Sequence, residues 1–272
     1  MIILTLLLGQ TAIDFADHLY ATGDYKRAAL EYERIGFADP DDTVWTPYAI
    51  LRAGEALLKS GDYKRAANVY EFGIKNISTR WEYFQYGYMR AEFADSGYPA
   101  VKIIAPRLKA SELAAKSSIY LAFADIYSGH PDSGLTILSS LEPDPLVDEV
   151  ISVLGTTPKR RSPWLSAGFS TLLPGAGQAY CGRWADAWQS LSITGIFAAA
   201  SVYYGFFSQD TTLGNTIKIA VTASLGGLFW LGNIYGAANA ALDYNDYEKR
   251  KKDEQLAILF SRFDLEPEIL KP

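Results

Sequence analysis

The stretch 184–242 carries only three charged side chains, and this scarcity of charge constrains the fold more than any other feature. Two runs within it, 188–207 and 219–242, contain no charged residue. Crossing the hydrocarbon core of a bilayer takes a helix of about 20 apolar residues. A polar segment, Asp210–Asn215, separates the runs. The sequence therefore predicts a transmembrane helical hairpin, because helices satisfy their own backbone hydrogen bonds in lipid. The alternative is a hairpin buried inside a soluble protein.

A shorter apolar piece, Ser162–Leu173, precedes these runs and ends at Pro174. Its length is about half of what a span needs. We therefore interpret it as an interfacial or re-entrant half-helix, with Trp164 at the level of the lipid headgroups. On this interpretation residues 156–163 are a linker, 164–247 a membrane module and 248–272 a charged C-terminal tail.

Small and polar residues interrupt the second apolar run. Gly232 and Gly236 have the spacing that lets two helix backbones approach closely, and Asn239 continues their stripe. Asn233 and Asn239 are costly against lipid, so both should face protein. We assign Gly232, Gly236 and Asn239 to helix packing; a transport pathway is the alternative.

The turn between the half-helix and the first run contains the segment PGAGQAYCGR, which starts at Pro174. Together with the preceding Ser-Pro it forms the pattern SP…PGxGQxYxG[KR]. The matching residues are Ser162, Pro163, Pro174, Gly175, Gly177, Gln178, Tyr180, Gly182 and Arg183. This pattern resembles that of many small bacterial membrane proteins, which are similar to the two-transmembrane-helix domain family. The resemblance implies a multi-pass module in the bacterial cell membrane, often fused to soluble repeats, and implies no reaction.

The first half of the chain contains an internal repeat. The segment Gly23–Ala29, GDYKRAA, recurs letter for letter at Gly61–Ala67, an offset of 38 residues. Weaker copies surround Tyr98 and Gly129. The glycines suit a left-handed residue that ends a helix, the alanines suit a close helix contact, and the tyrosines should fill the groove between the helices. The repeat signature is Gly23, Tyr25, Ala28, Gly61, Tyr63, Ala66, Tyr98 and Gly129.

This pattern resembles the tetratricopeptide repeat, whose period is about 34 residues. The resemblance covers residues 13–155 and implies an all-α solenoid of helical hairpins that binds a peptide or protein segment in its groove. Within the aromatic segment Arg80–Arg90, Trp81, Tyr83 and Tyr86 are candidates for this partner groove. The alternative is that Trp81, Phe84 and Tyr88 form helix core at helical spacing.

The apolar run at residues 1–12 ends in small residues, as a signal peptide does, although a positively charged leader is missing. We interpret it as a signal peptide, which places the repeats outside the cytoplasm; the alternative is the first turn of a buried helix. Basic clusters at Lys159–Arg161 and Lys249–Lys252 favour the cytoplasmic face instead. Both signals hold only if residues 164–182 also cross the bilayer.

The remaining chemistry is sparse. A net charge of −6 argues against a nucleic-acid partner, and one cysteine and two histidines form no metal-ligand spacing. We find no catalytic arrangement and expect no cofactor and no metal. The predicted function is a non-enzymatic, membrane-anchored scaffold or adaptor that recruits a protein or peptide partner at the cell envelope. The alternative is a subunit of an oligomeric transporter or channel, which implies a homo-oligomer.

Overall fold

The computed structural model describes residues 2–39 and 42–272, with side chains from residue 12 onward, and the described residues are all-α, without a strand. The chain divides into two compact units. The first, the repeat unit, comprises residues 1–154 together with 259–272. The second, the hairpin unit, comprises residues 155–258.

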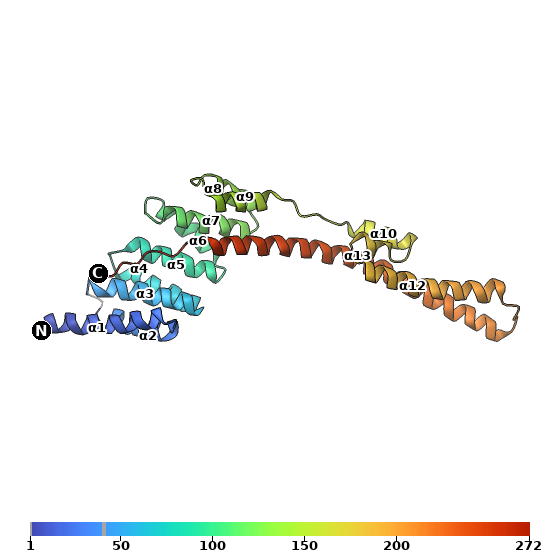
Figure 1. The fold of residues 1–272 in the computed structure, drawn as a ribbon, viewed down its shortest axis with the longest axis horizontal. Coiled ribbons are helices and arrows are strands. Elements are labelled where there is room, and N and C mark those ends of the chain that lie inside the picture. Colours follow the sequence, from blue (N-terminus) through green and yellow to red (C-terminus); the bar gives the residue numbers. More distant parts are fainter. Residues whose placement is uncertain (1, 40–41) are drawn as a thin grey trace. The chain divides into compact units, whose positions relative to one another are not determined.

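The repeat unit is an array of helix pairs in which each helix from α1 to α7 packs on the next (Figure 1). This confirms the expected hairpin array. Its elements are α1 (Ile2–Ala21), α2 (Tyr25–Ala38), α3 (Trp45–Ser60), α4 (Tyr63–Asn76), α5 (Trp81–Ala94), α6 (Tyr98–Ile104) with the 3₁₀ turn η1 (Ala105–Leu108), α7 (Ala114–Tyr127), α8 (Pro131–Ser139) and α9 (Pro145–Gly155). The predicted signal peptide falls on the start of α1, whose side chains before residue 12 lie outside the described set.

The turns between paired helices follow the predicted chemistry. Gly23 and Gly61 have φ near +80°, where a side chain would be strained, and each is followed by an aspartate that caps the next helix. Gly129 has the same backbone conformation. The third copy differs: Ser96 takes the left-handed position with φ 65°, and Gly97 does not.

The helix contacts are closest at small residues. Ala28 and Ala66 are fully buried, as predicted. Tyr25 and Tyr63 are only half-buried, and the rings that fill the core are Tyr32 and Tyr70, seven residues further along the same helices. Seven residues make about two turns, so both members of each pair lie on one stripe. The first member is less buried because it lies at the start of its helix, beside the turn.

Glycines make room for one of these rings. Gly54 and Gly87 both lie against Tyr70, where an added Cβ would come 2.3 Å from the ring. Helix α4 can therefore pack closely on both α3 and α5 only if these two positions lack a side chain.

The hairpin unit consists of two short helices and two long ones. These are α10 (Pro163–Leu172), α11 (Ala176–Tyr180), α12 (Trp184–Val202), which continues as the π turn η2 (Tyr203–Phe207), and α13 (Leu213–Arg262). By length and composition, Trp184–Phe207 and α13 could each cross a membrane. The predicted spans 188–207 and 219–242 lie within them. Most of the charged tail is also helical, because α13 runs to Arg262 and leaves only residues 263–272 outside a helix.

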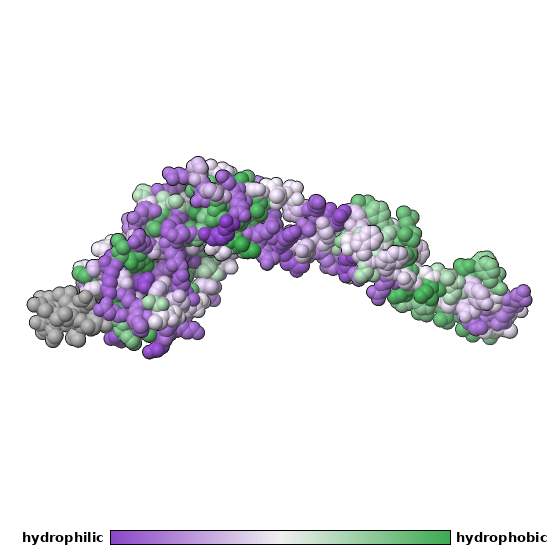
Figure 2. Space-filling model, viewed as in Figure 1, coloured by the Kyte–Doolittle hydropathy of each residue, from purple (hydrophilic) through white to green (hydrophobic). Residues whose placement is uncertain are grey.

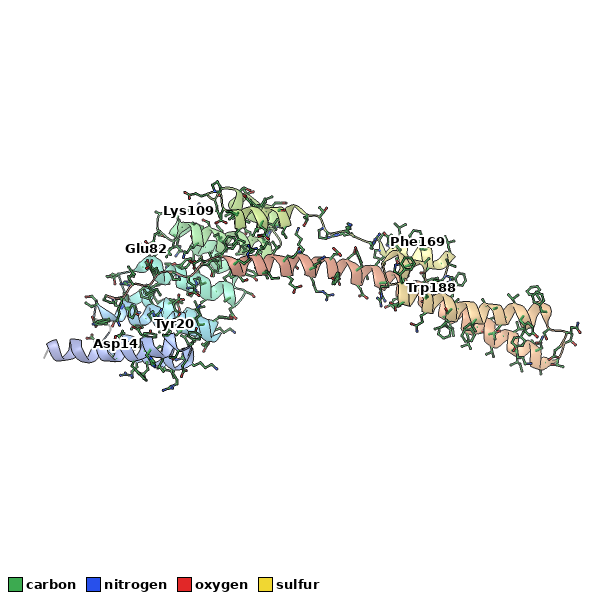
Figure 3. All side chains as sticks on the ribbon, in the orientation of Figure 1. Asp14, Tyr20, Glu82, Lys109, Phe169 and Trp188 are labelled. Atoms are coloured by element: carbon green, nitrogen blue, oxygen red, sulfur yellow. The ribbon has the colours of Figure 1, made fainter. Side chains whose placement is uncertain are left out.

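Apolar side chains cover the outside of this unit. Figure 2 shows them in green along α10, α12 and the adjoining part of α13. Trp164, Leu172 and Phe206 are each more than 80% exposed. Figure 3 labels two further aromatic side chains of this unit, Phe169 on α10 and Trp188 on α12. A water-soluble surface rarely shows so many apolar side chains together.

The two short helices double back on each other. The Ser166 hydroxyl of α10 donates to the carbonyl oxygen of Gly177 in α11, 3.0 Å away. Ten residues of α-helix extend about 15 Å, half the thickness of the hydrocarbon core. Residues 164–182 therefore form a short helical hairpin, and neither of its two helices has the length of a span.

Candidate functional site

A buried polar triad connects neighbouring hairpins of the repeat unit. The Tyr70 hydroxyl of α4 donates to the Glu55 carboxylate of α3 at 2.8 Å, and the Arg90 guanidinium of α5 binds the same carboxylate. All three side chains are at least nine-tenths buried. Burial by itself would lower the pKa of Arg90, but Glu55 together with Tyr120, Tyr70 and Tyr86 outweighs burial, so that pKa is raised. The Tyr70 hydrogen bond and the Arg90 ion pair to Glu55 join three consecutive helices.

A related, partly buried triad occurs one repeat earlier, and in it the arginine binds the tyrosine hydroxyl. The Tyr32 hydroxyl donates to Asp17 at 2.5 Å, and the Arg52 side chain donates to Tyr32 at 3.4 Å. Arg52 also lies 3.9 Å from the centre of the Tyr20 ring, a residue labelled in Figure 3. These residues precede the members of the second triad by 38 positions, the offset of the sequence repeat. Our sequence analysis missed the triads, although aligning the two copies over their whole length would have exposed them.

The tail segment, residues 263–272, lies along one face of the helix array (Figure 1, red). Side chains of the array donate to its main-chain carbonyls, which is how an extended peptide is held without regard to its sequence. The donors come from α5, from the residue that precedes α5, and from α7. The bonds run from Tyr86 Oη to Leu265 O (2.7 Å), from Lys116 Nζ to Glu266 O (2.5 Å) and from Arg80 Nη1 to Leu270 O (2.9 Å).

The side chains of the tail segment add specificity. Leu265 is 6% exposed, and Ile269 packs against the core of the array. Glu266 pairs with Lys59 of α3, which raises the pKa of that lysine. The array thus binds two apolar side chains four residues apart, Leu265 and Ile269, and one carboxylate between them, that of Glu266.

The two ends of this contact lie at opposite ends of the array. Near its start, the Phe260 ring packs at 4.9 Å from Phe93 and 4.7 Å from Phe123. At its end, Lys271 pairs with Asp14 at 2.7 Å and Asp17 at 3.0 Å, both on α1. The hydrogen bond to Asp14 is the main reason that the pKa of Lys271 rises to about 12. The tail segment therefore contacts α7, α5, α3 and α1.

The predicted groove residues have three different roles. Tyr86 is fully buried and holds the tail segment, and burial raises its pKa. Tyr83 instead donates to Glu112, which raises the pKa of Tyr83 to about 12. Trp81 is half-buried, and Phe84 belongs to the core, as the alternative interpretation held. The sequence could not separate these roles. Nearby positions on one helix point in different directions, and which direction faces the core depends on how the neighbouring helices pack.

In the hairpin unit, the predicted membrane motif forms a second buried cluster. A Cβ at Gly177 would come 2.0 Å from the carbonyl oxygen of Ser166 and 2.6 Å from Ala237 Cβ. Ser166 donates to the carbonyl oxygen of Ala237 at 2.7 Å. Gly177 therefore allows α10, α11 and α13 to meet.

Gln178 ties the motif to α13 with both ends of its amide. Its Nε2 donates to the side-chain oxygen of Asn233 at 2.6 Å and to the backbone oxygen of that residue at 3.1 Å. Its Oε1 accepts from the Ser170 hydroxyl at 3.0 Å. Buried amides satisfied in this way lock the register of two helices.

Most of the remaining motif residues set backbone turns. Gly175 and Gly182 have φ of 89° and 81° and delimit α11. Pro163 opens α10 behind a Ser162 cap, and Pro174 precedes the left-handed Gly175. These residues fix the local path of the backbone.

Tyr180 and Arg183 make ring and charge contacts. The Tyr180 ring lies 4.6 Å below the Arg161 guanidinium. Arg183 pairs with Asp186 at 2.5 Å and with Asp243 at 3.1 Å. Every motif residue thus has a structural reason within this unit.

A cavity of about 490 Å³ lies between α11, α12 and α13. Gly232, Gly236 and Asn239 all line it, together with Gln178. A Cβ at Gly232 would meet nothing within 4 Å, so this glycine does not serve the helix packing that we expected within the chain. The glycine at a close contact of α12 and α13 is Gly226, whose Cβ would lie 3.3 Å from Phe197.

Comparison of the chain with protein-family models, with curated proteins and with solved structures found no match. Within the part of the chain that the structure describes, no cluster of three or more His, Cys, Asp or Glu side chains could hold a metal ion.

Proposed function

We propose that this protein is a non-enzymatic scaffold, anchored in a membrane by α12 and α13, whose repeat unit binds an extended segment of a partner protein. The observation that carries the proposal is the tail segment, which the array holds through its main-chain carbonyls. A surface that already binds one extended peptide can exchange it for another of the same chemistry.

The identity of the repeats supports this assignment. The glycine turns, the aspartate caps and the tyrosine–carboxylate hydrogen bonds all recur at the offset of the sequence repeat. We therefore assign residues 13–155 to the tetratricopeptide-like class, whose members bind peptide segments.

The connections at the two ends of the hairpin unit set the number of membrane spans. The tail segment docks on the repeats that precede the hairpin unit, so the chain enters and leaves the bilayer on the same side and must cross it an even number of times. Two spans, α12 and α13, meet this requirement, because the α10–α11 hairpin is too short to add a third. Because the flanking clusters at 159–161 and 249–252 are basic, we propose the cytoplasmic face of a bacterial membrane, in place of the extracytoplasmic side expected from residues 1–12.

A fusion of alkaline phosphatase after residue 155 tests this side, because that enzyme is active only outside the cytoplasm. We expect no activity, whereas the same fusion after Asp210, in the loop between α12 and α13, should be active. The opposite pattern would reverse the orientation.

The predicted partner resembles the tail segment. It is an extended peptide with two apolar side chains four residues apart and an acidic residue after the first, which meet the sites of Leu265, Glu266 and Ile269. Because the tail segment occupies the surface, a partner binds only when the tail segment dissociates. The tail segment is part of the same chain and competes at an effective concentration typically near the millimolar range, so the partner must bind with high affinity or be locally concentrated.

The experiment uses the full chain in detergent and a fluorescent peptide of residues 264–272. In the wild type the attached tail should block the peptide. The double variant L265D/I269D should release the tail and bind the peptide at least about tenfold tighter than the wild type does. A tail variant that gains no affinity would show that this surface is fixed protein core, and the scaffold proposal would fall.

Two controls sharpen this result. Adding Y86F to the double variant should weaken binding of the peptide by about fivefold, since one hydrogen bond contributes about 1 kcal/mol. A peptide with both apolar residues replaced by aspartate should bind to none of the variants. Sedimentation with membranes after an alkaline wash tests the anchor separately, and release of the wild type would remove that part of the proposal.

The alternative function is a subunit of an oligomeric transporter or channel. The polar cavity lined by Gln178, Asn233 and Asn239 favours it. With two spans per chain, such a pathway needs several copies. Cross-linking in native membranes that yields only monomers would exclude this function.

A further inference from the structure

The cavity of the hairpin unit contains polar atoms that lack a partner. Thr194 and Asn233 are 9% and 6% exposed, and both line the cavity. Neither Thr194 Oγ1 nor Asn233 Nδ2 has a hydrogen-bond partner among the described residues. An unpaired polar group in a membrane-embedded site costs several kcal/mol. The site therefore calls for a ligand with oxygen acceptors at this depth.

The lining changes in character along the cavity. At the α11–α12 corner it presents the ion pair of Arg183 and Asp186. Hydroxyl and amide groups follow, and Ile193, Leu228 and Phe229 supply the apolar part. The order of charge, then hydrogen-bond donors, then hydrocarbon is the order of groups in a phospholipid. A water-filled cavity or a water-soluble solute would have no use for the apolar end.

From this order and the two unpaired atoms, we infer that the cavity is a binding site for one zwitterionic phospholipid. The Arg183 guanidinium faces the lipid phosphate, and the Asp186 carboxylate faces the amine. Thr194 and Asn233 donate to the ester carbonyls, and an acyl chain lies against Leu228 and Phe229. The inference rests on the proposed membrane anchor and does not depend on the peptide surface.

The charges select the headgroup. Arg183 pairs with two carboxylates, those of Asp186 and Asp243, so the cluster has a formal charge of −1. A headgroup of net negative charge is repelled by this cluster, whereas a headgroup with a positive and a negative group can complement it. The volume, about 490 Å³, lies within the range of ligand pockets and suits the headgroup and ester region.

Gly232 offers a way to fill the site without a clash. An added Cβ there meets no atom within 4 Å, and Gly232 lines the cavity. Gly227 is a matched control on the same helix, because its Cβ is equally free and it does not line the cavity. The full chain is purified in mild detergent, and native mass spectrometry measures binding of added phosphatidylethanolamine and phosphatidylglycerol.

We expect the wild type and G227L to retain phosphatidylethanolamine in preference to phosphatidylglycerol, and G232L to lose at least about tenfold in occupancy. T194V, which changes the shape of the site little, should weaken the lipid as well. Three results would overturn the inference: equal binding by G232L, equal or stronger binding by T194V, or equal competition by water-soluble glycerophosphoethanolamine. A wild type that binds no lipid and dissociates from dimers to monomers in G232L would assign the cavity to a second copy of the chain.

A failure here is distinguishable from a failure of the anchor. If the wild type leaves the membrane in an alkaline wash, the anchor itself is wrong. If it stays in the membrane and retains no phospholipid, only the cavity inference is wrong.

Discussion

The two units distribute their side chains in opposite ways. In the repeat unit the largest fully buried side chains are apolar or aromatic, such as Tyr32, Phe84 and Phe123. In the hairpin unit the side chains with the least exposure include Ser166, Ser170 and Gln178, while Trp164 is 88% exposed. Both units are pairs of helices, and the difference is the one expected when lipid surrounds the hairpin unit, as we propose. Helices in water associate by burying apolar area, whereas helices in lipid gain nothing from it and associate through close packing and hydrogen bonds.

The largest expected effect tests the buried Glu55–Arg90 pair inside the repeat core. Replacing Arg90 with leucine leaves the Glu55 carboxylate buried without a cation, which costs about 3–5 kcal/mol. Hydrogen exchange of the α4 and α5 amides in the full chain should report this loss. R27L is the control, because the exposed pair of Arg27 with Asp24 is worth below about 1 kcal/mol. If R90L and R27L lost equal stability, burial of the ion pair would not determine its contribution to folding.

The next effect tests close packing in the hairpin unit. An alanine at Gly177 forces α11 away from α10, because its Cβ would come 2.0 Å from the Ser166 carbonyl oxygen. The cost is about 1–3 kcal/mol. Cys181, now 5% exposed, should then react faster with a maleimide. G168A, whose Cβ meets nothing within 4 Å, should leave the rate unchanged. An unreactive Cys181 in G177A would show that the motif tolerates a side chain.

A smaller effect tests how the repeat unit holds the tail segment. Replacing Tyr86 with phenylalanine removes the bond to the Leu265 carbonyl and costs about 1 kcal/mol. Hydrogen exchange in residues 263–272 should accelerate by about fivefold. Y235F, an exposed position in α13, serves as the comparison and should change nothing. A tail segment with unchanged exchange in Y86F would mean that its side chains alone hold it.

The smallest effect is the pH dependence at the end of the tail segment. Burial would raise the pKa of Asp17, but hydrogen bonds from Tyr32, Lys271 and Tyr48 outweigh it and lower this pKa below 3.8. The pKa of Lys271 rises from 10.5 to about 12. A carboxylate whose pKa is lowered in the folded protein stabilises docking above its unfolded pKa, and a lysine whose pKa is raised stabilises docking below its unfolded pKa. Docking should therefore be constant between pH 3.8 and 10.5. It should weaken as pH falls below 3.8 and as pH rises from 10.5 through 12.

Fluorescence of a dye at Pro272→Cys, read against pH with C181S as background, checks this window. The variant K271Q should flatten the alkaline limb. A transition near neutral pH would contradict the assignment, because neither group titrates there.

The local elements were predictable from sequence because their causes are local. Gly23 and Gly61 stop helices by their own conformational freedom, and the uncharged runs fix α12 and the first part of α13. The same reasoning did not single out Tyr32 and Tyr70 as the fully buried rings, and it overlooked the triads. Tyr70, Glu55 and Arg90 are 15 to 35 residues apart, and no local pattern states that they meet.

By itself, the sequence determined that the described chain is helical, that its first half is an array of hairpins, and that two helices are suited to lipid. Only the tertiary structure decided that the last ten residues lie on the array, which pairs Tyr86 with a residue 179 positions later. It also decided that Gly232 faces a cavity and Gly177 a helix contact. The physical reason is that helix formation depends on neighbours within a few residues, whereas the partner of a buried polar atom is set by the packing of the whole unit.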